Sequence, residues 1–327
     1  MDLKEALGGR IAMVDEALEE SLDLDIQKKL YDAMRHLPLA GGKRLRPVMA
    51  MLVADAISGS GERTIPFGVA LELTHNFTLI HDDLMDQDDL RRGVITVHKA
   101  FDDPTAINAG DVLFARAFEV LTDLECDDHT MREIVRDLAK TVRLIGEGQQ
   151  SDMDFESRGD VTEDDAMRMI ELKTAVFFET AARGGALIAS GTPEQVEAMK
   201  KFGINVGIGF QLHDDLLDII GEEEKIGKPR WSDLREGKKT VILLHAIANA
   251  TPEDRQVIMD NVGREDVTQE ELAKVVEVLK ETGAIDYIQS TTKEMSDKAV
   301  EYLNVLPDSE HKELLIGIAD YMVSRDK

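Results

Sequence analysis

The spacing of apolar residues along the chain is mostly that of amphipathic helices. In the stretch LAKTVRLIGEGQQ, Leu138, Val142 and Ile145 recur at i, i+4 and i+7, which places them on one helical face. A second stripe of this kind runs through VEVLKETGAIDYIQ and is broken at Gly283. The dominant pattern therefore predicts helices.

Threonines followed by proline or acidic residues mark several helix starts. Thr192 and Thr251 each precede a proline, and Thr162 precedes an acidic first turn. Alternation of the strand type is confined to GVITVH, residues 93–98. Proline is rare and no Ser/Gly-rich linker is present, so we expect an all-α protein with short loops and a single domain over residues 1–327.

Composition and charge restrict the function. The 327 residues are 43% hydrophobic and 31% charged, and the net charge is −27. So negative a field repels nucleic acid and anionic membrane surfaces, and an anionic substrate would need a local basic or metal-filled pocket. The single cysteine, Cys126, excludes a disulfide within the chain and fits a reducing cytoplasm. We expect no signal peptide and no membrane span, because no apolar stretch is long enough.

The form DDxxD occurs twice, as DDLMD starting at Asp82 and DDLLD starting at Asp214. Within a helix Asp82 and Asp86 share one face, and so do Asp214 and Asp218. Like charges at this spacing destabilise a bare helix, and a hard divalent cation such as Mg²⁺ removes the repulsion. The motif thus predicts metal binding.

A single DDxxD in so acidic a chain is expected by chance often enough to be read as a solvated surface. Of the six Asp-Asp pairs, however, only these two are followed by the i+4 aspartate. Both follow an apolar helical stretch, which indicates an inward-facing position where acids need metal or partners. Because the motifs are far apart in sequence, they belong to different helices that could face each other across a cavity. The preceding His81 and His213 we expect to be structural.

A metal-diphosphate site also requires cations, which recur in short motifs. They are Lys43, Arg44 and Arg46 in GGKRLRP, Arg91 and Arg92 in RRG, Lys173 in ELKTAVF, and Lys228 and Lys238 in GKPRWSDLREGKKT. Arginine binds phosphate oxygens bidentately and lysine acts as a point charge. For Arg44 the sequence favours a surface salt bridge. Together with the aspartates, these residues indicate diphosphate chemistry.

Several independent motifs agree with one known family. They are GGKRLRP, the first DDxxD with RRG, GQxxD at 148–152, KT at 173–174, FQxxDDxxD at 210–218 and GKP with DxxxGK at 227–238. With them, the chain resembles the trans-isoprenyl diphosphate synthases, or polyprenyl synthetase family, over nearly its whole length. The resemblance implies an isoprenoid-synthase-type helical bundle around a central cavity, a homodimer, and small diphosphates as substrates.

The resemblance also implies a role for each motif. About three Mg²⁺ are expected, with Asp82, Asp86, Asp214 and Asp218 as the metal residues. Asp83 would lie behind the ligands, and Asp152 would be an additional acid. The residues expected to bind the allylic diphosphate are Arg91, Lys173, Lys228 and Lys238. Thr174 and Gln211 would support the carbocation or its leaving group by their dipoles. Isopentenyl diphosphate would contact Lys43, Arg46, His75 and Arg92.

Product length depends on Phe77 and Thr78, five and four residues before Asp82. Phe77 is either a core residue or the floor for the growing tail. A single aromatic residue at the Phe77 position makes this chain resemble the archaeal-type geranylgeranyl diphosphate synthases of the family. The expected reaction is a head-to-tail 1'-4 condensation giving geranylgeranyl diphosphate, and farnesyl diphosphate is the alternative product.

Trp231 departs from the family, which usually has glycine at this position of the loop between Lys228 and Lys238.

Three other functions fit the motifs less well. A terpene cyclase usually carries an Asn/Ser/Glu-type second motif, and a non-catalytic subunit typically lacks one aspartate motif. A di-iron bundle needs two Glu-x-x-His pairs, and Glu72–His75 is the one we find.

Overall fold

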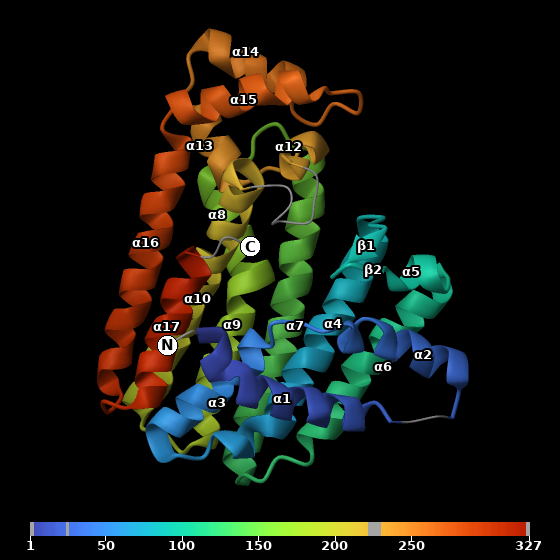
Figure 1. Cartoon of the computed structure of the whole chain (residues 1–327), viewed down its shortest axis with the longest axis vertical. Helices are drawn as coiled ribbons and strands as arrows, with labels where there is room; N and C mark the ends of the chain where they lie inside the picture. Colours follow the sequence, from blue (N-terminus) through green and yellow to red (C-terminus); the bar gives the residue numbers. More distant parts are fainter. Residues whose placement is uncertain (1–2, 24–25, 222–229, 325–327) are drawn as a thin grey trace. The chain divides into compact units, whose positions relative to one another are not determined.

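A computed structural model describes residues 3–23, 26–221 and 230–324 (Figure 1). Its residues group into two compact units. Unit 1 comprises 1–142, 180–200 and 303–317, and unit 2 comprises 143–179, 201–302 and 318–327. Four helices continue from one unit into the other: α7 (Asp128–Ser157), α9 (Val176–Ile188), α10 (Pro193–Ile220) and α17 (Glu310–Ser324). The expected single domain stays a prediction.

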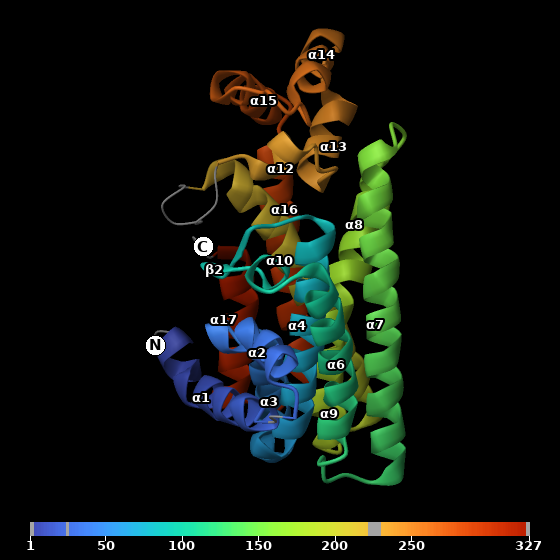
Figure 2. The ribbon, with the colours of Figure 1, turned by 90° about the vertical axis from the view of Figure 1, so that its right-hand side faces the viewer.

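Unit 1 is built from helices and one small hairpin. Its elements are α1 (Leu3–Ser21), α2 (Lys28–His36), η1 (Pro38–Ala40), α3 (Leu45–Ser58), η2 (Gly61–Thr64), α4 (Ile65–Met85), β1 (Leu90–Arg91), β2 (Val94–Ile95), α5 (Val97–Ala100), α6 (Asp103–Leu121) and η4 (Leu303–Val305). The long helix α4 runs along α6 (Figure 2) and also contacts α1 and α3.

Close helix packing holds α4 in the centre of unit 1. Phe67 of α4 is fully buried, and a Cβ atom on Gly184 would lie 2.3 Å from its ring. At Gly185 a Cβ atom would lie 2.4 Å from the carbonyl oxygen of Ala50 in α3. The glycine pair therefore lets α9 approach both helices, and α4 becomes a fixed support for the first aspartate motif.

Unit 2 contains the remaining elements. They are α8 (Glu163–Ile170), the π-helical turn η3 (Glu171–Ala175), α12 (Ser232–Glu236), α13 (Val241–Asn249), α14 (Pro252–Asn261), α15 (Gln269–Glu281) and α16 (Ala284–Tyr302). Helices α14 and α15 lie side by side (Figure 1). A core of buried aliphatic residues from α8, α10, α13, α15 and α16 includes Leu216, Ile242, Leu272, Ile288 and the ring of Trp231.

The expected helical character is confirmed, and the predicted helix starts are found. Thr162 and Thr251 cap α8 and α14, and Thr192 accepts from the backbone of Gln195 at the start of α10. The strand expected over 93–98 covers only Val94–Ile95. None of the described helices has the length and apolarity that crossing a membrane requires.

Candidate active site

The first aspartate motif closes helix α4 in unit 1. Asp82 lies in its last turn, and the backbone N–H of Asp86 donates to the Asp82 carbonyl oxygen at 2.8 Å. Asp82 is half-buried and Asp86 is exposed. Because residues at i and i+4 share a helical face, both carboxylates lie on one side of the helix end. This suits a Mg²⁺ ion that keeps water and phosphate oxygens among its ligands.

Asp83 is buried and tied to an arginine. Its side chain is 1% exposed, and Oδ1 accepts from Nε of Arg91 at 2.7 Å. Arg91 also donates to Asp88 at 3.0 Å. Burial raises the pKa of Asp83, and the charge of Arg91 opposes that rise. Asp83 thus fixes Arg91, which fits the expected place behind the metal ligands.

The β1–β2 hairpin directs the two arginines of RRG to different partners. Its turn holds Arg92 and Gly93, both in the left-handed region with φ of 54° and 78°. Arg91 turns to the aspartates, whereas Arg92 donates to the carbonyl oxygen of Gly41 at 2.6 Å and to Asn76 at 3.3 Å. The hairpin therefore links α4 to the loop that carries GGKRLRP.

Positive charge gathers around His75 on α4. Burial and the charges of Arg46 and Arg92 hold the pKa of His75 well below its ordinary value, so its ring is neutral near pH 7. Burial lowers the pKa of Arg46 to about 10, a shift that the nearby carboxylate of Glu72 opposes. Lys43 is exposed in the adjoining loop. Three of the residues predicted for isopentenyl diphosphate, His75, Arg46 and Arg92, are thus brought together.

Arg44 differs from its predicted place. It is 3% exposed, and it donates to Asp15 at 2.7 Å and to Glu72 at 2.8 Å. The expected surface salt bridge is therefore wrong, because Glu72 is itself buried on α4 at 2% exposure. An acid inside the apolar stretch FGVALELTHNF is the signal that would have pointed to a buried partner. The pairing also removes Glu72 from any di-iron site.

Phe77 lies in a row of aromatic rings between α4 and α6. Its ring centroid is 5.2 Å from that of Phe114 and 5.1 Å from that of His81. Thr78 is half-buried, and its hydroxyl donates to the carbonyl oxygen of His75 at 2.8 Å. The ring of Phe77 is thereby held in place by its neighbours.

His81 packs against the backbone of α6. Its Nε2 atom lies 3.1 Å from the carbonyl oxygen of Ile107, and a Cβ atom on Gly110 would lie 2.3 Å from the same nitrogen. This close approach supports the structural role expected for the ring.

In unit 2, Lys173 and Thr174 lie on the π-helical turn η3. Such turns widen a helix locally and frequently occur at functional sites. Lys173 donates to Asp152 of α7 at 2.7 Å. A Cβ atom on Gly148 of the same helix would lie 2.6 Å from the backbone nitrogen of Lys173. GQxxD therefore contributes both the partner of Lys173 and the space for its backbone.

A chain of polar contacts connects η3 to the second aspartate motif. Thr174 donates to Gln211 at 3.0 Å, and Gln211 donates to Asp215 at 2.9 Å. The Nζ atom of Lys238 lies 3.6 Å from Asp215 and 3.5 Å from Asp233. Burial raises the pKa of Asp215 to about 7 despite Lys238. For Lys238, burial lowers the pKa, but the charges of Asp215 and Asp233 outweigh it and the net shift is upward.

The aspartates of the second motif have different surroundings. Asp214 is exposed, whereas Asp218 is 8% exposed. Asp218 accepts from the backbone and hydroxyl of Ser232 at 3.1 and 2.7 Å, and from the backbone of Asp233 at 3.2 Å. Its carboxylate thus holds the first turn of α12, a role that the sequence did not reveal. Of the two, Asp214 is the more accessible to a cation.

Trp231 and Lys228 belong to the loop before α12. Lys228 lies outside the described residues. Trp231 is 7% exposed, its indole N–H donates to the carbonyl oxygen of Ile219 at 2.9 Å, and its φ is 64°. The ring is part of the unit 2 core. The left-handed backbone explains why glycine is the usual residue at this position.

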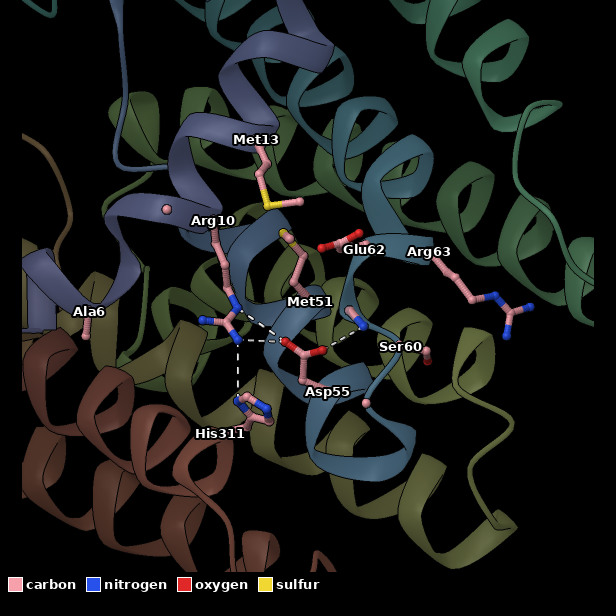
Figure 3. Close-up of a pocket in the computed structure, with 12 residues that line it drawn as sticks. Ala6, Arg10, Met13, Met51, Asp55, Ser60, Glu62, Arg63 and His311 are labelled. Atoms are coloured by element: carbon pink, nitrogen blue, oxygen red, sulfur yellow. Dashed lines mark hydrogen bonds and ion pairs between the residues drawn. The ribbon is translucent and has the colours of Figure 1, made fainter.

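A cavity of about 740 Å³ in unit 1 lies apart from these motifs (Figure 3). Arg10 of α1 lines this cavity. Its Nη2 atom donates to Asp55 at 2.7 Å and lies 3.4 Å from Nδ1 of His311. No residue predicted for substrate or metal lines it. The contacts of Arg10 with Asp55 and His311 give this cavity a structural explanation.

The described residues fit a metal that is completed by its substrate. In the part of the chain that the structure describes, no three His, Cys, Asp or Glu side chains form a ready-made metal cage. Mg²⁺ commonly takes one or two carboxylates and fills its other positions with phosphate and water oxygens. In unit 1, Asp82 is half-buried and Asp86 is exposed, and in unit 2 Asp214 is exposed, so each motif by itself offers a carboxylate that is open to such an ion.

Comparison with known proteins agrees with these motifs. The family model described as polyprenyl synthetase matches residues 27–279. The chain belongs to the polyprenyl synthetase family. It is 42% identical to geranylgeranyl diphosphate synthase of Methanosarcina mazei, over 100% of this chain and 99% of the relative. It is 38% identical to geranylfarnesyl diphosphate synthase of Natronomonas pharaonis, over 99% and 98%. The chain is accordingly a trans-prenyltransferase.

Solved structures of the family are similar over their full length. Geranylgeranyl pyrophosphate synthetase of Pyrococcus horikoshii has a TM-score of 0.95 at 38% identity, covering 99% of this chain and 98% of its own. A geranylgeranyl pyrophosphate synthase of Corynebacterium glutamicum, complexed with isoprenyl diphosphate and magnesium, has a TM-score of 0.88 at 28% identity, covering 99% and 100%. These relatives support the all-α isoprenoid-synthase fold and a divalent metal in the reaction.

Proposed function

We propose that this prenyltransferase condenses isopentenyl diphosphate with allylic diphosphates and that geranylgeranyl diphosphate is its main product. The observation that carries the proposal is the gathering of Arg46, Arg92 and His75 in a chain whose net charge is −27. Two half-buried guanidinium groups beside a neutral imidazole in so acidic a protein favour an anionic ligand. Farnesyl diphosphate as the main product is the alternative.

Isopentenyl diphosphate is assigned to the basic group of unit 1. Arg46 and Arg92 contribute guanidinium forks, which match the oxygens of a diphosphate. Lys43 adds a mobile point charge from the adjoining loop, and His75 donates a hydrogen bond as a neutral ring. This group has Glu72 as its buried counter-charge, so the bound diphosphate balances the remaining positive charge.

The allylic diphosphate is assigned to the remaining cations. They are Arg91, Lys173, Lys228 and Lys238. Asp82 and Asp86 would hold Mg²⁺ on this diphosphate, and Asp214, supported by Asp218, would hold a further ion, about three in all. When bound, these ions stabilise the negative charge that develops on the leaving diphosphate.

The reaction needs no nucleophile from the protein. The allylic C–O bond breaks and its electron pair leaves with the diphosphate, producing an allylic carbocation. The isopentenyl double bond attacks this cation, and the new bond joins C1 of the allylic chain to C4 of isopentenyl diphosphate. A proton is then lost to the released diphosphate. Thr174 and Gln211, fixed by their 3.0 Å hydrogen bond, direct oxygen dipoles that support the cation.

Phe77 is assigned as the floor for the growing chain. Its ring is held by Phe114 and His81, so it resists displacement by an added isoprene unit. Thr78 is small enough to leave room beside it. This combination stops growth later than two neighbouring aromatic residues would, and it fits the C20 product.

One assay tests the proposal. Purified protein is incubated with Mg²⁺, isopentenyl diphosphate and each of dimethylallyl, geranyl and farnesyl diphosphate, and the chain length of the product is measured. We expect C20 with every primer. A C15 end product would favour the alternative, and no condensation with any primer would favour a non-catalytic subunit. A Lys43→Ala variant should raise KM for isopentenyl diphosphate and leave KM for the allylic primer unchanged.

The homodimer and the cytoplasmic location belong to the same proposal. Family resemblance supports the homodimer, and the single cysteine, Cys126, supports a reducing compartment. Light scattering on a size-exclusion column should give twice the mass of the 36.3 kDa chain. A monomer that is active at the same concentration would contradict the dimer.

A further inference from the structure

Arg44 occupies a strained and buried position in the loop between η1 and α3 of unit 1. Its φ of 47° and ψ of 31° lie in the left-handed region, which residues other than glycine rarely adopt. The side chain is 3% exposed, so it cannot reach a substrate in solvent. Such a conformation persists only when the surroundings hold it, and here three contacts do.

These contacts connect Arg44 to three separate elements. Its Nε atom donates to Asp15 of α1 at 2.7 Å, and Nη1 donates to Glu72 of α4 at 2.8 Å. Nη2 donates to the carbonyl oxygen of Pro38 in η1 at 2.7 Å. The planar fork of arginine can satisfy all three partners at once, which a lysine ammonium at the end of a flexible stem does less well.

The loop that Arg44 anchors carries residues assigned to isopentenyl diphosphate. Lys43 and Arg46 flank it in sequence. A Cβ atom on Gly42 would lie 3.1 Å from Nη1 of Arg44 and 3.3 Å from Nη1 of Arg92. The guanidinium groups of Arg44 and Arg92 therefore both lie close to Gly42, and movement of Arg44 would be transmitted to the loop and to Arg92.

Glu72 is the electrostatic partner that this group shares. It is 2% exposed, and its charge acts on Arg44, Arg46 and Arg92. A buried carboxylate requires a paired cation, and Arg44 supplies it. If Arg44 were removed, the charge of Glu72 would act on Arg46 and Arg92 without its main partner, and these side chains would shift from their native positions.

We infer that Arg44 and Glu72 are a positioning pair for isopentenyl diphosphate. Arg44 neutralises Glu72 and fixes the loop that carries Lys43 and Arg46 and lies next to Arg92, so that these three cations keep the positions in which they meet the substrate. Neither member of the pair contacts the diphosphate. The inference rests on the proposed assignment of these three cations to isopentenyl diphosphate.

The first experiment measures KM for each substrate in Arg44→Lys, with the other substrate saturating. We expect KM for isopentenyl diphosphate to rise about tenfold, and KM for the allylic primer to change less than about twofold. Arg10→Lys is the matched control, because Arg10 is a second arginine of unit 1 that is paired with an acid, although it is only partly buried (Figure 3). It should lower the melting temperature without changing either KM. Equal KM values in Arg44→Lys and the native protein would overturn the inference.

A second comparison separates charge balance from general stability. In Arg44→Met the carboxylate of Glu72 loses its partner, and we expect a larger rise in KM for isopentenyl diphosphate than in Arg44→Lys. Adding Glu72→Gln removes the unpaired charge, so the double variant should recover part of the lost affinity. A double variant with a KM at or above that of Arg44→Met would contradict the pair.

Asp15→Asn keeps the inference testable if the Arg44 variants do not fold. The Asp15 side chain is 48% exposed, so its loss of charge should be tolerated. We expect about a threefold rise in KM for isopentenyl diphosphate, and no rise would overturn the inference. Lys43→Ala distinguishes failure of the proposed substrate assignment from failure of the positioning pair. If Lys43→Ala leaves KM unchanged, the proposed substrate assignment fails; if it raises KM and the Arg44 and Asp15 variants do not, only the positioning pair fails.

Discussion

The side-chain nitrogen of Lys173 lies 2.7 Å from Oδ2 of Asp152, and both side chains are about four-fifths buried. This ion pair connects the π-helical turn η3 to helix α7. Solvent and salt screen the attraction within a partly buried ion pair less than within a surface pair, so this pair holds its side chains in place more strongly. Asp152 thus holds Lys173 in one rotamer before any diphosphate binds.

We predict that Asp152→Asn raises KM for the allylic primer several-fold, because the ammonium of Lys173 gains conformational freedom. Lys173→Met should raise it further. The double variant should resemble Lys173→Met alone, with effects that are less than additive. Steady-state kinetics measures all three. Asp154→Asn on an exposed position of the same helix is the control and should change KM little. Fully additive effects would show that the two residues act independently.

Gly148 gives a sharper test of how η3 is placed. A Cβ atom there would lie 2.6 Å from the backbone nitrogen of Lys173, so Gly148→Ala forces α7 and η3 apart. We expect a loss of about 1–3 kcal/mol in stability and a fall in kcat/KM of about 100-fold. Thermal melting and kinetics provide the measurements.

Gly146→Ala is the matched control on α7. A Cβ atom at Gly146 has nothing within 4 Å. Alanine should therefore be neutral or stabilise the helix by up to about 1 kcal/mol, with activity unchanged. Similar losses in both variants would mean that the cause is general to α7 and not the contact with Lys173.

Local sequence patterns predict the helices and their starts, because these depend on neighbouring residues. Thr162 caps α8 through contacts within four residues, and such signals are complete in the sequence. The strand predicted over 93–98 was too long, because a local pattern does not show where the next helix begins. The backbone N–H of Thr96 still donates to the Asp89 carbonyl oxygen across the hairpin, but α5 begins at Val97, so the strand ends after Ile95.

The partners of the predicted site residues were not visible from the sequence. Arg44 has its contacts in α1, α4 and η1, and Asp218 holds the first turn of α12 across a loop. Each contact joins positions separated by 6 to 29 residues, and no local pattern specifies it. The chemistry of a motif is therefore predictable from residue types, whereas its supports depend on tertiary packing.

Phe77→Ser should lengthen the product. Removing the ring opens space next to Phe114, which lies 5.2 Å away, and the chain can then take up a further isoprene unit. We expect C25 or longer products by chromatography of the hydrolysed diphosphates. Phe101→Ser, whose ring contacts His36 instead, should still give C20. Unchanged C20 product from Phe77→Ser would contradict the hypothesis that the Phe77 ring limits the length of the growing chain.

The capping box of α15 predicts a pH dependence. Hydrogen bonds from Arg264 and Thr268 lower the pKa of Glu271 from 4.5 to about 2. A carboxyl whose pKa is lower in the folded state stabilises the protein above pH 4.5, and this stability is lost as pH falls toward 2. Glu271→Gln should therefore melt at a lower temperature than the native protein above pH 4.5, and the difference should shrink toward pH 2. Glu270→Gln should show no such convergence.

Trp231 should stabilise unit 2 despite its backbone conformation. A left-handed φ of 64° costs a non-glycine residue about 1–2 kcal/mol, so Trp231→Gly removes a real strain. It also removes a buried ring, which is worth about 3–5 kcal/mol, and a hydrogen bond to Ile219 worth about 1 kcal/mol. The balance favours tryptophan, and we expect Trp231→Gly to lose about 2–5 kcal/mol in denaturant unfolding.

Trp231→Phe separates the two contributions. Phenylalanine keeps an apolar ring and the same φ, but it leaves the carbonyl oxygen of Ile219 without the indole donor at the end of α10. We expect a loss of about 1 kcal/mol, smaller than that of Trp231→Gly. If Trp231→Gly were instead more stable than the native protein, the backbone strain would outweigh the buried ring. In that case the tryptophan would have to be explained by what it does for the neighbouring Asp218 and α12, and the activity of the glycine variant would decide that question.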